Sequence, residues 1–138
     1  MTQSWLAFTL VSLGLYGLVG IFAKISSGYI DARSMAVTQG LAYIVISLAL
    51  LGSLGFKLQV HTVGSPAALL AGLAGGLGTV AVFFAYSRGG QASLVSPMVA
   101  MYPLVTIPLS IVVLKEQITI FNGLGIVLAL AAVVLFSR

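Results

Sequence analysis

The stretch LVSPMVAMYPLVTIPLSIVVL, residues 94–114, contains no charged side chain. About 20 helical residues cross the roughly 30 Å hydrocarbon core of a bilayer, so this stretch is long enough to span one. Three of the four prolines of the chain lie in it, namely Pro97, Pro103 and Pro108. A proline removes a backbone N–H and kinks a helix, and a carbonyl freed in this way is costly in lipid. We therefore expect a broken helix whose freed carbonyls, those of Val99 and Leu104, face protein or a water-filled path.

The composition of the whole chain extends this conclusion to a fold class. Of 138 residues, 60% are hydrophobic and 6% are charged, against roughly 25% charged residues in soluble domains. We predict an all-α integral membrane bundle of five transmembrane helices that forms a single domain over residues 1–138. The predicted spans are 5–25, 34–55, 66–87, 94–114 and 120–136. The first span lacks a basic segment before it and is expected to be retained rather than cleaved as a signal peptide.

Charged residues fall singly at the predicted helix boundaries, which excludes a phosphate-binding patch and a nucleic-acid partner. Lys24, Arg33, Arg88 and Arg138 are expected on one side of the membrane, and Lys57 and Lys115 on the other. This weak bias favours an external amino terminus and still permits insertion in both orientations. Three boundary charges, Lys24, Lys115 and Glu116, are expected to anchor helix ends, with Lys24 reaching toward the headgroups. Asp31 and Arg33 are expected to pair in a loop, and His61 is expected to be solvated.

Small and polar residues recur within the spans at helical spacing, which places them along stripes. Such stripes pack helices in ordinary bundles, and Gly72 with Gly76 forms a GxxxG pair of that type. Taken together, the stripes predict a moderately polar cavity without formal charge. The candidate substrate-path residues are Tyr16, Gln39, Tyr43, Thr79, Tyr86, Ser93, Ser96, Tyr102 and Pro103.

Catalytic and metal chemistry find no support in the sequence. The chain has no cysteine and one histidine, and hydroxyl groups without a neighbouring base are inert. We predict a protein that is not an enzyme and has no metal or cofactor. The two carboxylates, Asp31 and Glu116, lie at predicted boundaries. A proton-coupled cation pump needs a carboxylate inside the membrane, so the sequence favours facilitated diffusion or exchange of a neutral or zwitterionic solute.

Three sequence motifs carry a resemblance to a known family. ASLVSPMVAMYP at 92–103, LKE at 114–116 and LYGLVGIFAK at 15–24 resemble the EamA module of the drug/metabolite transporter superfamily, with Tyr16 standing where tryptophan is more usual. The resemblance implies a five-helix module that occurs twice in larger relatives, as inverted halves around a central cavity. It implies that Glu116 closes the fourth helix.

Because residues 1–138 contain one such module, the resemblance implies that a second chain supplies the other half. The simplest source is a homodimer, which can be antiparallel, in a bacterial or archaeal inner membrane. Such a dimer is expected to move small neutral or zwitterionic metabolites, such as amino-acid-like solutes, by alternating access. Two alternatives stay open: a lipid-carrier flippase subunit, and a non-transporting subunit that assembles with a larger membrane protein.

Overall fold

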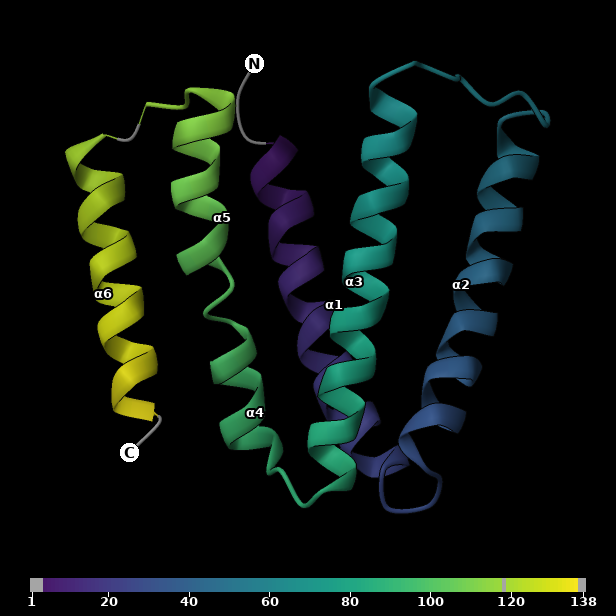
Figure 1. Ribbon diagram of the computed structural model, residues 1–138, viewed down its shortest axis with the longest axis horizontal. Coiled ribbons are helices and arrows are strands. Elements are labelled where there is room, and N and C mark those ends of the chain that lie inside the picture. Colours follow the sequence, from purple (N-terminus) through teal and green to yellow (C-terminus); the bar gives the residue numbers. More distant parts are fainter. Residues whose placement is uncertain (1–3, 118, 137–138) are drawn as a thin grey trace. The chain divides into compact units, whose positions relative to one another are not determined.

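The computed structural model describes residues 4–117 and 119–136, which form helices joined by turns. The helices are α1 (Ser4–Ser26), α2 (Ala32–Ser53), α3 (Gly64–Ser87), α4 (Ala92–Val99), α5 (Pro103–Leu109), the π-helix η1 (Ser110–Leu114) and α6 (Ile120–Phe136) (Figure 1). They form two compact units, residues 1–89 with α1 to α3 and residues 90–138 with the remaining helices. The predicted all-α architecture is confirmed for the described residues, and a single domain stays a prediction.

Four described segments are long and apolar enough to cross a bilayer. They are Ala7–Ser26, Ala32–Ser53, Gly64–Ser87 and Ala92–Leu114. Helix α6 has 17 residues, which at about 1.5 Å per residue gives about 26 Å, slightly less than a typical hydrocarbon core. Its bounds agree with the predicted fifth segment, but whether it crosses the membrane stays a prediction.

Helix α2 begins at Ala32, earlier than predicted, because Asp31 caps it. The Asp31 carboxylate accepts hydrogen bonds from the Ser34 hydroxyl and from the backbone N–H groups of Arg33 and Ser34. The expected ion pair between Asp31 and Arg33 is wrong for the described residues, since Asp31 engages the backbone of Arg33 instead. The Ser34 hydroxyl and these N–H groups hold the pKa of the Asp31 carboxyl below its usual value. An oxygen acceptor at this position satisfies N–H groups that no helical carbonyl can reach.

Replacing Asp31 by alanine is expected to lower the thermal stability of the fold in a pH-dependent way. Because the pKa of Asp31 is lowered in the folded state, its stabilisation is present above the unfolded pKa and is lost as pH falls through the folded value. The deficit of Asp31→Ala should therefore be largest near neutral pH and shrink below about pH 4. Thermal unfolding in detergent micelles, followed by circular dichroism, measures this. Asp31→Asn keeps the acceptor without titrating and should remove the pH dependence, and a deficit of Asp31→Ala that is constant with pH would contradict the prediction.

The start of α3 is capped by His61, which the sequence analysis expected only to be solvated. His61 is exposed, but its Nδ1 accepts from the backbone N–H groups of Val63 and Gly64, each at 3.2 Å. The backbone N–H of His61 in turn donates to Ser65 Oγ at 3.0 Å. This reciprocal exchange resembles a capping box and fixes the point at which the chain enters the third span.

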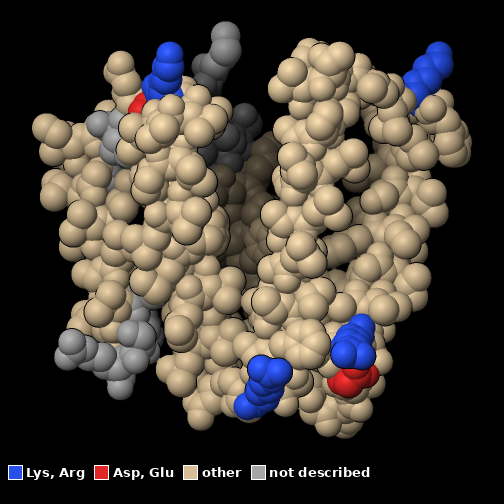
Figure 2. Space-filling view, viewed as in Figure 1, with Lys and Arg blue, Asp and Glu red and all other residues tan. Residues whose placement is uncertain are grey.

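Close packing in the first unit is concentrated at one end. Its buried side chains belong to the last turns of α1, the first turns of α2 and the last turns of α3: Ala23, Ala32, Met35, Phe83 and Tyr86. Figure 1 shows α2 and α3 drawing together toward this end. On the face shown in Figure 2, charged side chains occur only near helix ends, with uncharged residues between them. This distribution is the one expected of a segment that crosses lipid.

The fourth predicted span, residues 94–114, lies in the second unit and is broken, as its prolines predict. Helix α4 ends at Val99 and α5 begins at Pro103. Pro103 has no N–H to donate to the carbonyl of Val99. This carbonyl accepts a hydrogen bond from the N–H of Tyr102 instead, at 3.1 Å. The Val99 carbonyl thus finds a donor in the backbone of the break itself, and the expectation that the freed carbonyls face protein or a water-filled path stays a prediction. The N–H of Leu104 turns to the carbonyl of Met101 at 2.9 Å, so the carbonyl of Ala100 accepts no hydrogen bond from the described residues.

Candidate functional site

A hollow between α2 and α3 is the candidate site of the first unit, and we call it the α2–α3 pocket. Its volume is about 180 Å³. Its lining residues are Ala36, Gln39, Gly40, Tyr43, Gly76, Thr79 and Val80. The positions follow helical spacing on both helices, so each set forms one face. A side chain placed on Gly40 or Gly76 would meet no atom within 4 Å, which shows that these two glycines leave the space open.

Three predicted path residues supply polar groups to the α2–α3 pocket. Gln39 and Tyr43 are one turn apart on α2, and Gln39 Nε2 donates to Tyr43 Oη at 2.6 Å. Thr79 on α3 donates from Oγ1 to the carbonyl of Gly75 at 2.9 Å. No charged side chain is among the described residues that line the pocket. The result is a mostly apolar wall with a few neutral hydrogen-bonding groups, which is the usual make-up of a small-molecule site.

The other predicted path residues lie elsewhere. In the first unit Tyr16 is 75% exposed, and Tyr86 is buried at the packed end. In the second unit Ser93, Ser96 and Tyr102 are exposed on the broken segment. None of these five lines the α2–α3 pocket or the hollow lined by α4, α5 and α6 that is described next. The structure therefore gathers Gln39, Tyr43 and Thr79 and leaves the rest apart.

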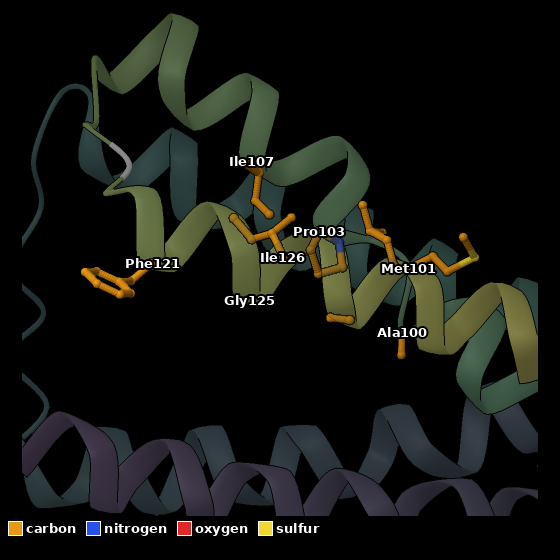
Figure 3. Close-up of a pocket in the computed structure, with 9 residues that line it drawn as sticks. Ala100, Met101, Pro103, Ile107, Phe121, Gly125 and Ile126 are labelled. Atoms are coloured by element: carbon orange, nitrogen blue, oxygen red, sulfur yellow. The ribbon is translucent and has the colours of Figure 1, made fainter.

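The second unit has its own hollow, which we call the α4–α6 pocket (Figure 3). Its volume is about 440 Å³, and its lining comes from the break after α4, from α5 and from α6. The lining residues are Ala100, Met101, Pro103, Ile107, Phe121, Gly125, Ile126, Ala129 and Leu130. Figure 3 shows the side chain of Ile107 directed toward Ile126, with Pro103 nearby. Apart from backbone groups at the helix break, this pocket offers only apolar contacts.

Lys24 lies against an aromatic ring at the packed end of the first unit. Its Nζ is 5.9 Å from the centre of the Tyr86 ring. Tyr86 is 3% exposed, and the predicted extension of Lys24 to the headgroups stays a prediction. Arg88 makes a similar contact with Phe84 at 6.0 Å. The contact of Lys24 joins the end of α1 to the end of α3, whereas the contact of Arg88 stays within the end of α3.

Removing the Lys24 charge is expected to destabilise the first unit. Cation–π contacts contribute from about 0.5 kcal/mol at exposed sites to about 2 kcal/mol when desolvated, and Lys24 is only partly exposed. Lys24→Met should therefore lower the midpoint of thermal unfolding in micelles, whereas Lys24→Arg should preserve it. Lys57→Met is the matched control, because Lys57 lies beyond the other end of α2 and is exposed. Equal effects of Lys24→Met and Lys57→Met would remove the cation–π explanation.

The predicted boundary residues after η1 act through the backbone. Lys115 adopts a left-handed conformation with φ of 54°, which ends the π-helix. The N–H of Glu116 donates to the carbonyl of Ser110 at 3.4 Å. Both side chains are exposed, as expected for residues at a membrane boundary. The Glu116 side chain itself caps nothing in the described structure.

Two functional features were missed by the sequence reasoning. Gly40 lines the α2–α3 pocket, and its signal was its place three residues before Tyr43 and four after Ala36. The α4–α6 pocket had a weaker signal, since Gly125 and Ala129 are two of several small residues on α6. Apolar lining residues look the same in sequence whether they meet lipid, another helix or a hollow.

Apolar helices of spanning length, charges at their ends and pockets without charged lining together define an integral membrane protein. The chain belongs to the EamA-like transporter family, whose family model matches residues 3–138. This membership agrees with the sequence motifs, which predicted a single EamA module of the drug/metabolite transporter superfamily. It is 36% identical over 61 residues to an uncharacterised protein of Methanocaldococcus jannaschii. The aligned stretch covers 44% of this chain and 44% of that relative's length. No solved structure matches the chain.

Proposed function

We propose that the chain is one five-span half of a carrier that pairs with a second copy and moves small neutral or zwitterionic solutes by alternating access. The observation that carries the proposal is the α2–α3 pocket. Its amide, phenol and hydroxyl groups sit within helices that are otherwise apolar. Gln39 pairs with Tyr43, and Thr79 pairs with the carbonyl of Gly75. Their remaining hydrogen-bonding capacity suits a solute in a shared cavity, because lipid offers no polar partner.

The positions of the carboxylates limit the coupling mechanism. Asp31 precedes α2, and Glu116 follows η1, so neither lies inside a described span. Exchange of a proton for a cation requires an acidic group within the membrane. We therefore propose facilitated diffusion or exchange in a bacterial or archaeal inner membrane. The organism of the matched relative, an archaeon, supports the choice of membrane.

Counterflow in liposomes tests the carrier function. Purified protein is reconstituted into vesicles loaded with unlabelled solute, and uptake of the same radiolabelled solute is followed for a panel of amino acids and neutral metabolites. We expect uptake above that of empty vesicles for at least one solute. The same vesicles with a proton gradient should show no added accumulation. Absence of uptake for every solute of the panel would contradict the carrier function and favour the alternative of a non-transporting subunit that assembles with a larger membrane protein.

Pairing with an inverted second copy has its own test. Single cysteines introduced after α2 and after α3 are labelled from outside intact cells with a membrane-impermeant maleimide. We expect each position to be labelled in part of the population, because both orientations are present in an antiparallel dimer. Labelling of only one of the two positions would exclude an antiparallel homodimer while leaving a parallel one.

The α4–α6 pocket favours a second candidate, the lipid-carrier flippase subunit. A hollow of about 440 Å³ with apolar side chains suits a hydrocarbon chain better than a metabolite. This candidate predicts movement of a fluorescent polyprenyl lipid between leaflets in the same liposomes. Movement of the lipid without solute counterflow would replace the metabolite carrier by the flippase.

A further inference from the structure

We propose that the α2–α3 pocket selects an uncharged group that both donates and accepts hydrogen bonds, such as a primary amide or an alcohol, over a carboxylate or an ammonium. The inference rests on the proposed carrier function and narrows its substrate class. Its basis is the hydrogen-bonding capacity left over among the described lining residues, together with the absence of a counter-charge and the size of the hollow.

The unused hydrogen-bonding capacity of the pocket is mixed. Tyr43 Oη accepts from Gln39 Nε2 at 2.6 Å, so the phenol keeps its own proton for donation. Gln39 keeps its carbonyl oxygen as an acceptor. The hydroxyl of Thr79 already donates its proton to the carbonyl of Gly75, so toward a ligand it can only accept a hydrogen bond. An amide or alcohol complements this set because it carries both kinds of group.

Charged ligands do not match the same set. A carboxylate only accepts and an ammonium only donates, so each leaves part of the lining unpaired. An unpaired polar group in a desolvated site is costly, and a charge without a counter-ion is more costly still. Lys24, the cation on α1, contacts Tyr86. Tyr86 is about two helical turns from Thr79 along α3, so Lys24 gives the pocket no direct counter-charge.

The α2–α3 pocket is small. Its volume is about 180 Å³. Pockets for drug-sized ligands are larger, about 300–1,000 Å³. The pocket therefore accepts a compact solute or the polar end of a larger one. Acetamide and acetate, which have nearly the same shape and differ in charge, are the matched probes for this site.

Binding of these probes to the purified full chain in detergent micelles tests the inference. Saturation-transfer NMR titrations measure the affinity for acetamide, acetate and glycine. We expect acetamide to bind roughly tenfold or more tightly than acetate, which cannot donate a hydrogen bond, and than glycine, whose two formal charges meet no counter-charge in the lining. Undetectable acetamide binding, or acetate or glycine binding as tight as that of acetamide, overturns the inference.

Variants with matched controls assign the binding to this pocket. Tyr43→Phe and Thr79→Val should each weaken acetamide binding by roughly threefold to tenfold. Tyr29→Phe changes an exposed loop tyrosine and should have no effect. Thr38→Val should also have no effect, since Thr38 Oγ1 donates to the carbonyl four residues earlier at 2.8 Å, as Thr79 does, but does not line the pocket. Circular dichroism verifies that each variant is folded, and equal losses in the control and pocket variants would place the binding elsewhere.

The carrier function and the selectivity of the α2–α3 pocket can be contradicted by different results. Selective acetamide binding without solute counterflow would keep the pocket assignment and remove the carrier function. Counterflow of zwitterions without acetamide binding would keep the carrier and overturn the selectivity assigned to the pocket.

Discussion

Replacing Pro103 by alanine is expected to lower solute counterflow by roughly tenfold, a change of about 1.4 kcal/mol in the barrier. The break between α4 and α5 exists because Pro103 has no N–H to offer the carbonyl of Val99. Alanine restores that donor and favours a continuous helix by about 3 kcal/mol relative to proline. Straightening the segment moves Met101 and position 103, which line the α4–α6 pocket, and removes the irregular backbone that distinguishes this span.

The control for Pro103→Ala is Pro66→Ala. Pro66 lies in the first turn of α3, where proline is tolerated because its missing N–H has no helical partner. Counterflow per reconstituted molecule should be unchanged in this variant. If Pro103→Ala lowered the yield of folded protein while each molecule kept its full rate, the break would be a folding device rather than part of the path.

Filling the α2–α3 pocket with Gly76→Leu is expected to reduce counterflow by tenfold or more. A leucine side chain occupies much of a hollow of about 180 Å³, and a Cβ at position 76 meets no atom within 4 Å. The substitution also improves helix propensity by about 0.8 kcal/mol, so lost flux would not arise from unfolding of α3. The measurement is the liposome assay, with rates normalised to incorporated protein.

Gly78→Leu is the matched control for this substitution. Gly78 lies on the same helix with equally open surroundings, yet it does not line the pocket. The same gain in helix propensity should then leave transport intact. Comparable losses in both variants would indicate that added bulk anywhere on α3 disturbs the protein, for example at a subunit interface.

The helices were largely predictable because membrane spans follow from composition and length. The expected segment 120–136 corresponds to α6, and the early start of α2 reflects a single cap by Asp31. The prolines correctly indicated a break, but its detail depended on backbone geometry. Sequence alone does not show that the N–H of Tyr102 turns back to Val99, or that the N–H of Leu104 turns to Met101 and leaves the carbonyl of Ala100 without a donor among the described residues.

The candidate site was only partly predictable because helix rotation decides which stripes face each other. Gln39, Tyr43 and Thr79 meet since Gly40 and Gly76 lie between α2 and α3. Tyr86 has the same chemistry as Tyr43 and helical spacing from Thr79, but it is buried at the packed end beneath Lys24. In the sequence, the phenol of Tyr43 and the phenol of Tyr86 both indicate a polar stripe. Only the packing of the helices decides that Tyr43 lines a pocket and Tyr86 is buried.

The uncharged lining of both pockets determines how such a carrier responds to voltage. Each elementary charge that crosses 100 mV exchanges about 2.3 kcal/mol with the membrane field. Neither lining includes an ionisable side chain among the described residues, so reorientation of the pockets with a net-neutral cargo performs no electrical work. For the proposed carrier we therefore expect electroneutral transport, in which the concentration ratio of the solute alone sets the direction of net flow.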